Sequence, residues 1–340
     1  MDEVRPIYFA LIGCGLVGKR RAAALPAGTL RYACDLQAKE ADQLAQQYPG
    51  CTGTDRLKDI LADEKVTALI VATAHSALAP ITLAAVEAGK HVLVEKPGAI
   101  HAGQLEAIEG AALRTGSLVR IGYNHRYHPA ILKADQLIAQ EDLGDLMFVR
   151  GRYGHGGRLG FDREWRANPK LSGGGELLDQ GVHLIDLAIH FQGEFSVIDG
   201  HTPTYFWDMP VDDNAFMSLR TSDGRTAWLH VSCTEWKNLF SFELYFRRAK
   251  LHAEGLGGSY GVERLTYYRM LPEMGPPQTT IFEYPRADDS WSRELQEFIT
   301  DIVKHRTPVP GLVEGKSILR IVETLYAKSG LSGLAPDDKS

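Results

Sequence analysis

Aspartate and histidine side chains recur at helical intervals in the second half of the chain. Asp179, His183 and Asp186 are spaced by four and three residues, which places them on one face of a helix. A carboxylate one turn from an imidazole suits proton transfer, because the imidazole titrates near neutral pH. In the alternative interpretation, these residues and His190 form the solvated stripe of an amphipathic helix. The run Gly173–Gly175 before them would let a ligand or another domain approach closely.

Glycines in a G-x-G-x-x-G pattern form a second feature with chemical meaning. Gly13, Gly15 and Gly18 follow the apolar run 7–12 and open a helical stretch. This context is typical of dinucleotide binding, because the helix N-terminus offers backbone N–H groups to a pyrophosphate. Asp35 ends a later apolar run, where a carboxylate accepts hydrogen bonds from ribose hydroxyls and repels a 2′-phosphate. We therefore expect NAD as the cofactor, with NADP as the alternative; the glycines alone also fit an ordinary strand–helix turn.

Three basic residues, Lys19, Arg20 and Arg21, come directly after this glycine pattern. They could assist in holding phosphate groups, since cationic side chains bind phosphate through charge-assisted hydrogen bonds. Their position within a helix favours a solvated helix face instead, and we adopt that interpretation.

A lysine in a turn is the third candidate for chemistry. Lys96 follows the apolar run 91–94 within the sequence Glu95-Lys96-Pro97-Gly98. Open α/β sheets bind ligands beyond the carboxyl ends of their strands, so the ammonium group would lie near a nicotinamide. There it could stabilise a developing alkoxide or polarise a carbonyl. A surface lysine in a Pro-Gly turn is the alternative.

The elements that must position these residues follow one pattern before Gly122. Short apolar runs alternate with helical stretches, which is typical of a parallel sheet covered by helices on both faces. We therefore expect an α/β, doubly wound Rossmann domain. Its predicted strands are 7–12, 30–34, 68–72, 91–94 and 118–122, and its predicted helices are 16–25, 39–48, a stretch through 83–86, and 104–114.

A different pattern follows Gly144, because strands there are no longer separated by helices. This favours an α+β domain with a large, mostly antiparallel open sheet. The predicted strands are 147–153, 215–221, 227–234 and 240–246, and the predicted helices are 129–139, 176–191, 290–305 and 315–329. We expect domains at 1–122 and 123–334, a C-terminal helix that is free to pack back on the first domain, and a frayed tail at 335–340.

Composition limits the classes of function. The 340 residues carry 37 Lys and Arg against 43 Asp and Glu, a net charge of −6, which excludes a dedicated nucleic-acid binder. The longest apolar run, Ala68–Ala72, is too short for a membrane span, and the first residues lack a signal core. The four cysteines form no C-x-x-C pair, so we expect no structural metal and a cytoplasmic protein.

Several motifs, taken in order, carry a resemblance to one family. They are Gly13-x-Gly15-x-x-Gly18, Glu95-Lys96-Pro97, Gly122-Tyr123-Asn124-x-Arg126-Tyr127 and Gly173-Gly174-Gly175-x-Leu177-x-Asp179-x-Gly181-x-His183-x-x-Asp186. On these motifs the sequence resembles the glucose–fructose oxidoreductase / inositol dehydrogenase family, Gfo/Idh/MocA, over almost its whole length. The resemblance implies a Rossmann domain and a second α/β domain whose open sheet serves in oligomer contacts. It also implies NAD(P)-dependent oxidation or reduction of a hydroxyl on a sugar, cyclitol, sugar acid or nucleotide sugar.

The resemblance implies roles for individual residues. Lys96, Asp179 and His183 match the family's catalytic lysine, aspartate and histidine, with His183 as the proton acceptor. Arg126 and Arg166 would suit a substrate carboxylate or phosphate, with interdomain ion pairing as the alternative. The expected cofactor-binding residues are Gly13, Gly15, Leu16, Val17, Gly18, Asp35, Thr73, His75, Glu95, Lys96 and Asn124. The expected substrate-binding residues are Lys96, Tyr123, His125, Arg126, Tyr127, Arg152, Trp165, Arg166, Asp179, His183 and Trp236.

One stretch departs from the family pattern. Relatives often have Thr-Pro after the third predicted strand and a histidine four residues beyond that proline. Here Ala74 follows Thr73, and Leu78 takes the histidine position. We therefore assign His75 no role beyond lining the cofactor.

Two other functions stay open. Bound NAD could be recycled in a redox-neutral epimerisation or glycoside cleavage, or the chain could be a non-catalytic NAD-dependent sensor. The intact set of Lys96, Asp179 and His183 argues against the sensor. As partners we expect a small carbohydrate-like substrate, no nucleic acid and no membrane, and a homodimer or homotetramer formed through the C-terminal sheet.

Overall fold

The computed structural model describes residues 6–331, which group by their contacts into two compact units. Of the described residues, the first unit holds 6–123 together with Trp291–Leu319, and the second holds Asn124–Ser290 and 320–331. The functional division into a cofactor domain and a substrate domain, with its limits, stays a prediction. The tail at 335–340 lies outside the described residues. Among the helices that the structure describes, none has the length and apolar character needed to cross a membrane.

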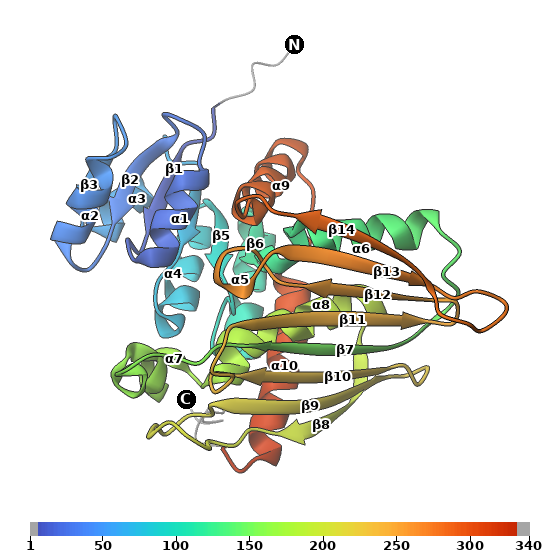
Figure 1. Ribbon diagram of the computed structural model, residues 1–340. Coiled ribbons are helices and arrows are strands. Elements are labelled where there is room, and N and C mark those ends of the chain that lie inside the picture. The colour runs from blue at the N-terminus through green and yellow to red at the C-terminus, as the bar shows by residue number, and fades with distance from the viewer. Residues whose placement is uncertain (1–5, 332–340) are drawn as a thin grey trace. The chain divides into compact units, whose positions relative to one another are not determined.

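The first unit is built on a six-stranded parallel sheet with the strand order β3-β2-β1-β4-β5-β6 (Figure 1). This is the order of the doubly wound dinucleotide-binding fold, so the predicted Rossmann architecture is confirmed. The apolar strands β1 and β4 are buried along their whole length. The strands are β1 (Phe9–Ile12), β2 (Leu30–Cys34), β3 (Thr52–Thr54), β4 (Ala68–Val71), β5 (His91–Glu95) and β6 (Val119–Gly122). The helices are α1 (Leu16–Ala24), α2 (Ala38–Ala45), α3 (Leu57–Ala62), α4 (His75–Glu87) and α5 (Ala102–Thr115).

A late helix, α9 (Ser290–Lys304), contributes to the core of the first unit. Leu295, Phe298 and Ile302 recur at helical spacing and pack into one hydrophobic cluster with Phe9 and Leu11 of β1. The segment Trp291–Leu319 therefore belongs to the first unit although it follows the second in the sequence.

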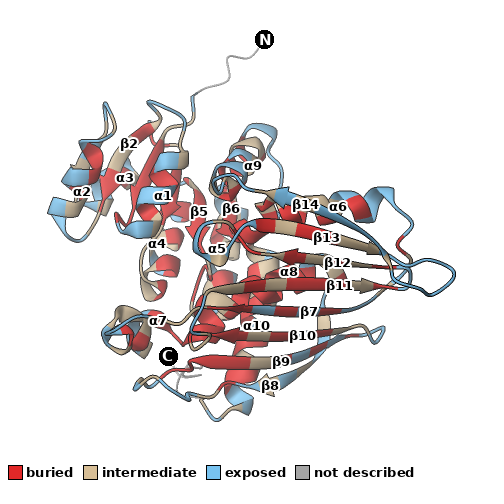
Figure 2. Ribbon diagram, viewed as in Figure 1, coloured by how far each residue is buried: buried red, intermediate tan, exposed pale blue. Residues whose placement is uncertain are grey.

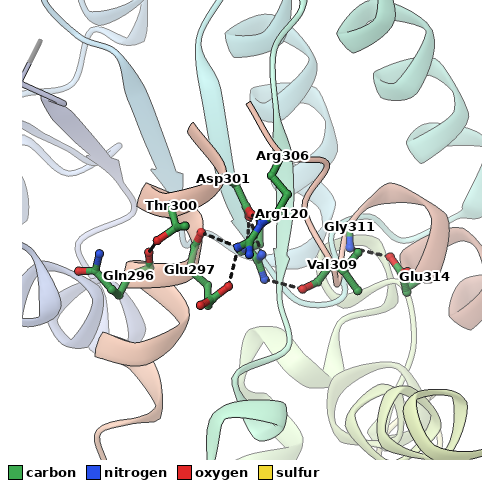
Figure 3. Close-up of polar contacts among 9 residues, drawn as sticks. All are labelled: Arg120, Gln296, Glu297, Thr300, Asp301, Arg306, Val309, Gly311 and Glu314. Carbon is green, nitrogen blue, oxygen red and sulfur yellow. Dashed lines mark hydrogen bonds and ion pairs between the residues drawn. The ribbon is translucent and has the colours of Figure 1, made fainter. Parts of the chain in front are cut away.

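A buried arginine ties β6 to α9 (Figure 3). Arg120 donates from Nε and Nη2 to Asp301 Oδ2 at 2.9 and 2.5 Å, and from Nη1 to the carbonyl oxygen of Val309 at 2.8 Å. Arg306 Nε donates to the other oxygen of Asp301 at 2.6 Å. The buried carboxylate is thus compensated by two guanidinium groups, as burial of a charge requires. After the segment that contains Arg306 and Val309, the chain forms α10 (Leu312–Lys328).

The second unit is built on an eight-stranded sheet with the strand order β14-β13-β12-β11-β7-β10-β9-β8. All neighbouring strands are antiparallel except β7 and β10, so the predicted, mostly antiparallel sheet is confirmed. The strands are β7 (Leu146–Gly154), β8 (Phe195–His201), β9 (Asn214–Thr221), β10 (Thr226–Ser232), β11 (Leu239–Phe246), β12 (Ala249–Glu254), β13 (Glu263–Arg269) and β14 (Gln278–Tyr284). The longer helices of this unit are α6 (Pro129–Gln140) and α8 (Val182–Gln192), and a short helix, α7 (Pro169–Ser172), lies before α8 in the sequence.

One face of this sheet is covered by helices. The helix α8 packs on β7 and β10, and α6 packs on β12, β13 and β14 (Figure 1). Along β7 the burial alternates, with Val149, Gly151 and Tyr153 buried and Arg150 and Arg152 exposed (Figure 2). Because side chains alternate across a strand, this pattern assigns the buried set to the helix-covered face and the arginines to the opposite face.

Candidate active site

The G-x-G-x-x-G turn joins β1 to α1. Gly13 has φ +96°, and a Cβ atom on it would clash with the carbonyl oxygen of Ala72. A Cβ atom on Gly18 would clash with the carbonyl oxygen of Gly13. Gly15, at the N-cap of α1, differs because, among the residues that the structure describes, no atom beyond its chain neighbours lies within 4 Å of its Cβ position, and its φ of −70° is ordinary. The protein itself does not require glycine at this position, whereas a ligand lying against the helix N-terminus would.

Asp35 follows β2 and holds the same turn. Its Oδ2 accepts the N–H of Cys14 at 2.8 Å, and its Oδ1 accepts the N–H of Gln37 at 2.9 Å. These bonds fix the carboxylate beside the glycine turn, and each oxygen keeps a lone pair for a further donor such as a ribose hydroxyl. In the first turn of α1, Leu16 is exposed and Val17 is half-buried.

The prediction of a solvated helix face for Lys19, Arg20 and Arg21 is wrong for Arg21. Lys19 and Arg20 are exposed, whereas Arg21 is buried. Its Nε donates to Glu95 Oε1 at 2.6 Å, and its Nη1 lies 2.6 Å from Glu294 Oε2. Burial lowers the pKa of Arg21, but the two carboxylates outweigh burial and leave the pKa raised. Glu95 therefore anchors α1 to the strand end that precedes Lys96.

Three candidate residues follow neighbouring strands. Gly13 follows β1, Thr73 follows β4 and Lys96 follows β5, and these strands are adjacent in the sheet. Because the strands are parallel, all three residues lie at one edge of the sheet, where open α/β sheets bind ligands. His75 is buried in the first turn of α4, and Leu78, at the family's histidine position, belongs to the core.

The helix predicted over 176–191 has two parts. Leu177–Gly181 forms a π-helical turn, and α8 continues from Val182. Such turns within helices occur frequently at functional sites, because the extra residue per turn redirects side chains. This π turn carries Asp179, and the first turn of α8 carries His183.

Gly174 and Gly175, which precede this helix, lie against side-chain and backbone atoms of their own unit. A Cβ atom on Gly174 would clash with the hydroxyl of Tyr326, and one on Gly175 would clash with the carbonyl oxygen of Asp212. The expectation that a ligand or another domain approaches these glycines is therefore wrong for Gly174 and Gly175, because protein atoms take that space.

Asp212 caps the start of the π turn. Its carboxylate accepts the N–H groups of Gly175 and Leu177 at 3.0 and 2.7 Å and the hydroxyl of Tyr326 at 2.8 Å. Burial raises the pKa of Asp212 to about 6, although these three donors act in the opposite direction. The carboxylate thereby satisfies backbone donors that a helix start leaves without partners.

The stripe of aspartate and histidine side chains is mostly buried. Asp179, His183 and Asp186 are 5%, 4% and 0% exposed, so the solvated-stripe alternative is wrong for these three residues. His190 does reach solvent, and its Nε2 lies 2.9 Å from Asp135 Oδ1. Buried titratable groups on one helix face are candidates for chemistry, since burying them without function would cost stability.

Arginines compensate the buried aspartates. Arg166 Nε donates to Asp179 Oδ2 at 2.8 Å, and its guanidinium lies 4.6 Å from the ring centroid of Trp165. Arg126 donates to both oxygens of Asp186 at 2.8 and 2.6 Å. Both of these ion pairs form within the second unit.

The rings of His125 and Tyr153 lie beside His183. The imidazole of His125 stacks on it with ring centroids 3.8 Å apart and an angle of 13° between the planes. Tyr153 presents its ring nearly edge-on to His183, with centroids 6.2 Å apart and an angle of 81°. Tyr153 also shares a hydrogen bond with the hydroxyl of Tyr260, and burial raises the pKa of Tyr153 well above its usual value, so this phenol stays protonated.

Several residues near this cluster were not predicted from the sequence. Glu176 is buried, its Oε1 lies 3.5 Å from His155 Nε2, and its charge acts on Tyr153. The inward position of Tyr153 could have been inferred from strand alternation along 147–153. No signal in the sequence places Asp212 or Tyr326 beside the glycine run, because both come from distant segments.

Two expected substrate contacts, Arg152 and Trp236, are exposed. Arg152 is exposed on the sheet face opposite Tyr153, where its register partners are His230 and Ser241. Trp236 is 68% exposed, and its ring lies edge-on to Phe206 with centroids 4.8 Å apart.

The remaining expected contacts follow β6. Asn124 is buried and its Nδ2 donates to Ser290 Oγ at 2.9 Å. Tyr123 is buried and Tyr127 is half-buried. Within this segment, His125 lies against His183 and Arg126 pairs with Asp186, and both of these partners are on α8.

Comparison with known families identifies the class of this chain. Residues 7–123 match the model described as oxidoreductase family, NAD-binding Rossmann fold, and residues 131–252 match the model of the GFO/IDH/MocA C-terminal domain. The chain belongs to the Gfo/Idh/MocA family of oxidoreductases, as the motifs predicted.

Individual relatives are similar over different lengths. Levoglucosan dehydrogenase of Pseudarthrobacter phenanthrenivorans is 27% identical over 63% of this chain and 58% of its own length. D-glucoside 3-dehydrogenase of Escherichia coli is 24% identical over 94% of this chain and 95% of its own length. The match to the first relative thus spans less than two thirds of that protein.

Solved structures share the fold. Levoglucosan dehydrogenase in complex with NADH and levoglucosan has a TM-score of 0.83 at 21% identity, over 95% of this chain and 98% of that one. UDP-N-acetylglucosamine 3-dehydrogenase from Acidithiobacillus ferrooxidans has a TM-score of 0.79 at 20% identity, over 96% and 98%. The two-part α/β architecture is therefore that of these dehydrogenases.

Proposed function

We propose that this protein is an NAD-dependent dehydrogenase that transfers a hydride between nicotinamide and a hydroxyl-bearing carbon of a carbohydrate-like substrate. The observation that carries the proposal is the burial of Asp179 and His183 on one helix of the family's C-terminal domain. A solvated stripe would have served only to keep the helix soluble, whereas a buried acid and imidazole four residues apart suit proton transfer.

The residues of the first unit fit a dinucleotide. Gly15 leaves open space at the N-terminus of α1, and Asp35 offers a fixed carboxylate beside it. We propose that these residues, with Gly13, Gly18 and Thr73, hold NAD, and that the carboxylate of Asp35 disfavours NADP. When bound, NAD supplies the acceptor for the hydride that leaves the hydroxyl-bearing carbon.

The chain's own residues would manage the proton and the charge. We propose that the His183 imidazole accepts the proton of the substrate hydroxyl as the carbon is oxidised. The Lys96 ammonium would stabilise the negative charge that develops on that oxygen, because a fixed cation acts most strongly on charge formed in the transition state. Asp179, held by Arg166 at 2.8 Å, would orient the substrate or His183. In the reduction direction His183 would donate this proton to the oxygen, while Lys96 and Asp179 would keep the same roles.

The substrate class rests on the relatives. Their names specify levoglucosan, D-glucosides, inositols and UDP-N-acetylglucosamine, all of which present secondary hydroxyl groups. We propose a substrate of this kind: a sugar, cyclitol, sugar acid or nucleotide sugar.

The experiment that tests the proposal is a screen of such compounds with NAD and with NADP, followed by NADH fluorescence. The proposal expects net NADH formation with at least one compound and weaker use of NADP. Conversion of a compound without net NADH would instead support the redox-neutral epimerase or glycoside-cleaving alternative. NAD binding without conversion of any compound in the class would contradict the proposed dehydrogenase.

We also propose a cytoplasmic location and a homodimer or homotetramer. Cys14, Cys34 and Cys233 are free and buried, as suits a reducing compartment. Phe148 and Trp228 are 39% and 65% exposed on the uncovered face of the large sheet, where a second copy could cover them. Cell fractionation tests the location, and sedimentation of wild type against Trp228→Glu tests the assembly; a monomeric wild type would contradict it.

A further inference from the structure

The imidazole of His125 lies directly against the proposed proton acceptor. Its ring is nearly parallel to that of His183, with 3.8 Å from centroid to centroid and 13° from plane to plane. His125 comes from the 3₁₀ turn Asn124–Tyr127, so it is held by a different element from α8. The orientation of His183 therefore depends on a ring that α8 does not control.

Three further rings hold His125 from its sides. Their centroids lie 5.1 Å away for Tyr153, 5.7 Å for Phe240 and 5.6 Å for His128, each at 74° or more to the His125 plane. Edge-to-face contacts of this kind are favourable between aromatic rings and fix their relative tilt. His125 is thus oriented by its surroundings, and one of its faces supports His183.

The charges around the two imidazoles are mostly paired. His128 Nδ1 lies 2.9 Å from Glu263 Oε2, Asp179 is paired with Arg166, and Tyr153 shares a hydrogen bond with Tyr260. Two positive imidazole rings at 3.8 Å would repel each other strongly in a buried site, so a proton on one ring disfavours a proton on the other. A neutral His125 ring, by contrast, offers an aromatic face to a positively charged His183.

We propose that His125 is a positioning residue for His183: its neutral ring fixes the His183 imidazole by stacking and supports the imidazolium formed when His183 accepts the substrate proton. This inference rests on the proposed function, in which His183 is that acceptor. It requires a flat ring at position 125 but no exchangeable proton there. A role for His125 in relaying the proton would require the opposite.

The test compares His125→Phe with His125→Ala. Phenylalanine keeps a flat ring and cannot carry a proton, whereas alanine removes the ring. Matched controls are His230→Phe and His230→Ala, because His230 is also stacked, on Phe216 at 4.3 Å and 8°, but lies on the other face of the sheet. Each variant is measured for kcat, KM, NADH affinity and thermal stability.

We expect His125→Ala to lower kcat by about tenfold or more, with little change in KM or NADH affinity. We expect His125→Phe to restore kcat to within about threefold of wild type, and both His230 variants to keep it. Equal losses in the Phe and Ala variants would overturn the inference in favour of proton relay. Full activity of His125→Ala would overturn it by removing any role for the ring.

A second readout separates this inference from the proposed function. The imidazole C–H signals of His183, observed by NMR in protein with isotope-labelled histidine, should show a ring-current shift in wild type and in His125→Phe that disappears in His125→Ala. Absence of that shift in wild type would overturn the stack even if the enzyme oxidises a sugar. If the stack is present but no compound is converted, the proposed function fails. The inference that His125 positions a catalytic histidine then fails with it.

Discussion

The protein contains two glycine-rich turns that look alike in sequence but have different causes. In the second unit, Gly174 and Gly175 make room for Tyr326 and Asp212, which belong to the same unit. In the first unit, Gly13 and Gly18 also avoid protein atoms, but among the described residues no atom beyond the chain neighbours of Gly15 lies within 4 Å of its Cβ position. A glycine run alone therefore does not indicate a ligand, and neither does open space alone; what distinguishes Gly15 is open space at a helix N-terminus that follows a strand of a parallel sheet.

A buried charge anchors the helix at each turn. On α1 it is the Arg21 guanidinium, held by Glu95 and Glu294. At the π turn it is the Asp212 carboxylate, held by backbone N–H groups and a tyrosine hydroxyl. Each anchor is linked to a proposed catalytic residue. Arg21 pairs with Glu95, which directly precedes Lys96 in the chain. Asp212 caps the π turn that carries Asp179.

The largest effect on stability is expected at the turn of Gly174 and Gly175, where protein atoms crowd the glycines. In Gly175→Ala, the new methyl group would overlap the backbone of Asp212, which cannot move cheaply. We expect a loss of at least about 3 kcal/mol in the free energy of unfolding, measured by chemical denaturation. Gly103→Ala is the matched control, because that glycine lies in α5 with no atom within 4 Å of its Cβ position. A Gly175→Ala protein as stable as Gly103→Ala would show that the turn is not crowded in solution.

The next largest effect is the pH dependence of stability that Asp212 causes. Burial raises the pKa of Asp212 to about 6 from a usual value of 3.8, so the folded state holds this proton more tightly than the unfolded state. The contribution of Asp212 to the free energy of unfolding is therefore most favourable below about pH 4. It falls by about 3 kcal/mol as pH rises through 6.

The pH prediction is checked by comparing unfolding free energies of wild type and Asp212→Asn across this range. Their difference should change with pH between 4 and 6, because asparagine does not titrate. Glu294, whose pKa burial raises to about 7, contributes with the same sign in both proteins and cancels in the difference. A difference that is constant across the range would contradict the assignment.

At the turn of Gly15 we expect a substitution to change NADH binding without changing the stability of the protein. The methyl group of Gly15→Ala meets no protein atom, so the unfolding temperature should stay within a few degrees of wild type. The affinity for NADH should fall by about tenfold or more, equivalent to about 1.4 kcal/mol, because the methyl group occupies the space proposed for the pyrophosphate. Titration of NADH fluorescence measures this, and unchanged affinity would remove the distinction drawn between the two turns.

The smallest effect concerns the choice of cofactor. Asp35→Asn keeps the size of the side chain and an oxygen that can accept the Cys14 N–H, but removes the charge. We expect the preference for NAD over NADP to shrink by about three- to tenfold, since a 2′-phosphate is no longer repelled. The ratio of kcat/KM for the two cofactors measures it; a ratio equal to that of wild type would argue against a ribose contact.

The alternating pattern of the first unit could be predicted from the sequence because its strands are continuous apolar runs. Short or half-exposed strands could not: β3 is Thr-Gly-Thr, and β14 is exposed along most of its length. The burial of Arg21 was also missed, because its partner Glu294 lies on α9, in a segment that follows the whole second unit.

The candidate site was predictable where its residues share a local motif. Asp179, His183 and Lys96 stand in such motifs, whereas the stack of His125 on His183 depends on two elements meeting in space. Periodicity alone could not decide whether the stripe of Asp179, His183 and Asp186 is exposed to solvent or buried. The arginines that compensate it, Arg126 and Arg166, lie on segments outside the helix.

The central claim is that His183 accepts the substrate proton, and the most direct test replaces it by alanine. His190→Ala is the matched control on the same helix, since His190 reaches solvent and pairs with Asp135. With the substrate found by the screen, we expect His183→Ala to lower kcat by about 10²–10⁴-fold at unchanged NADH affinity, and His190→Ala to keep the wild-type rate. A His183→Ala protein that turns over as fast as His190→Ala would contradict the account.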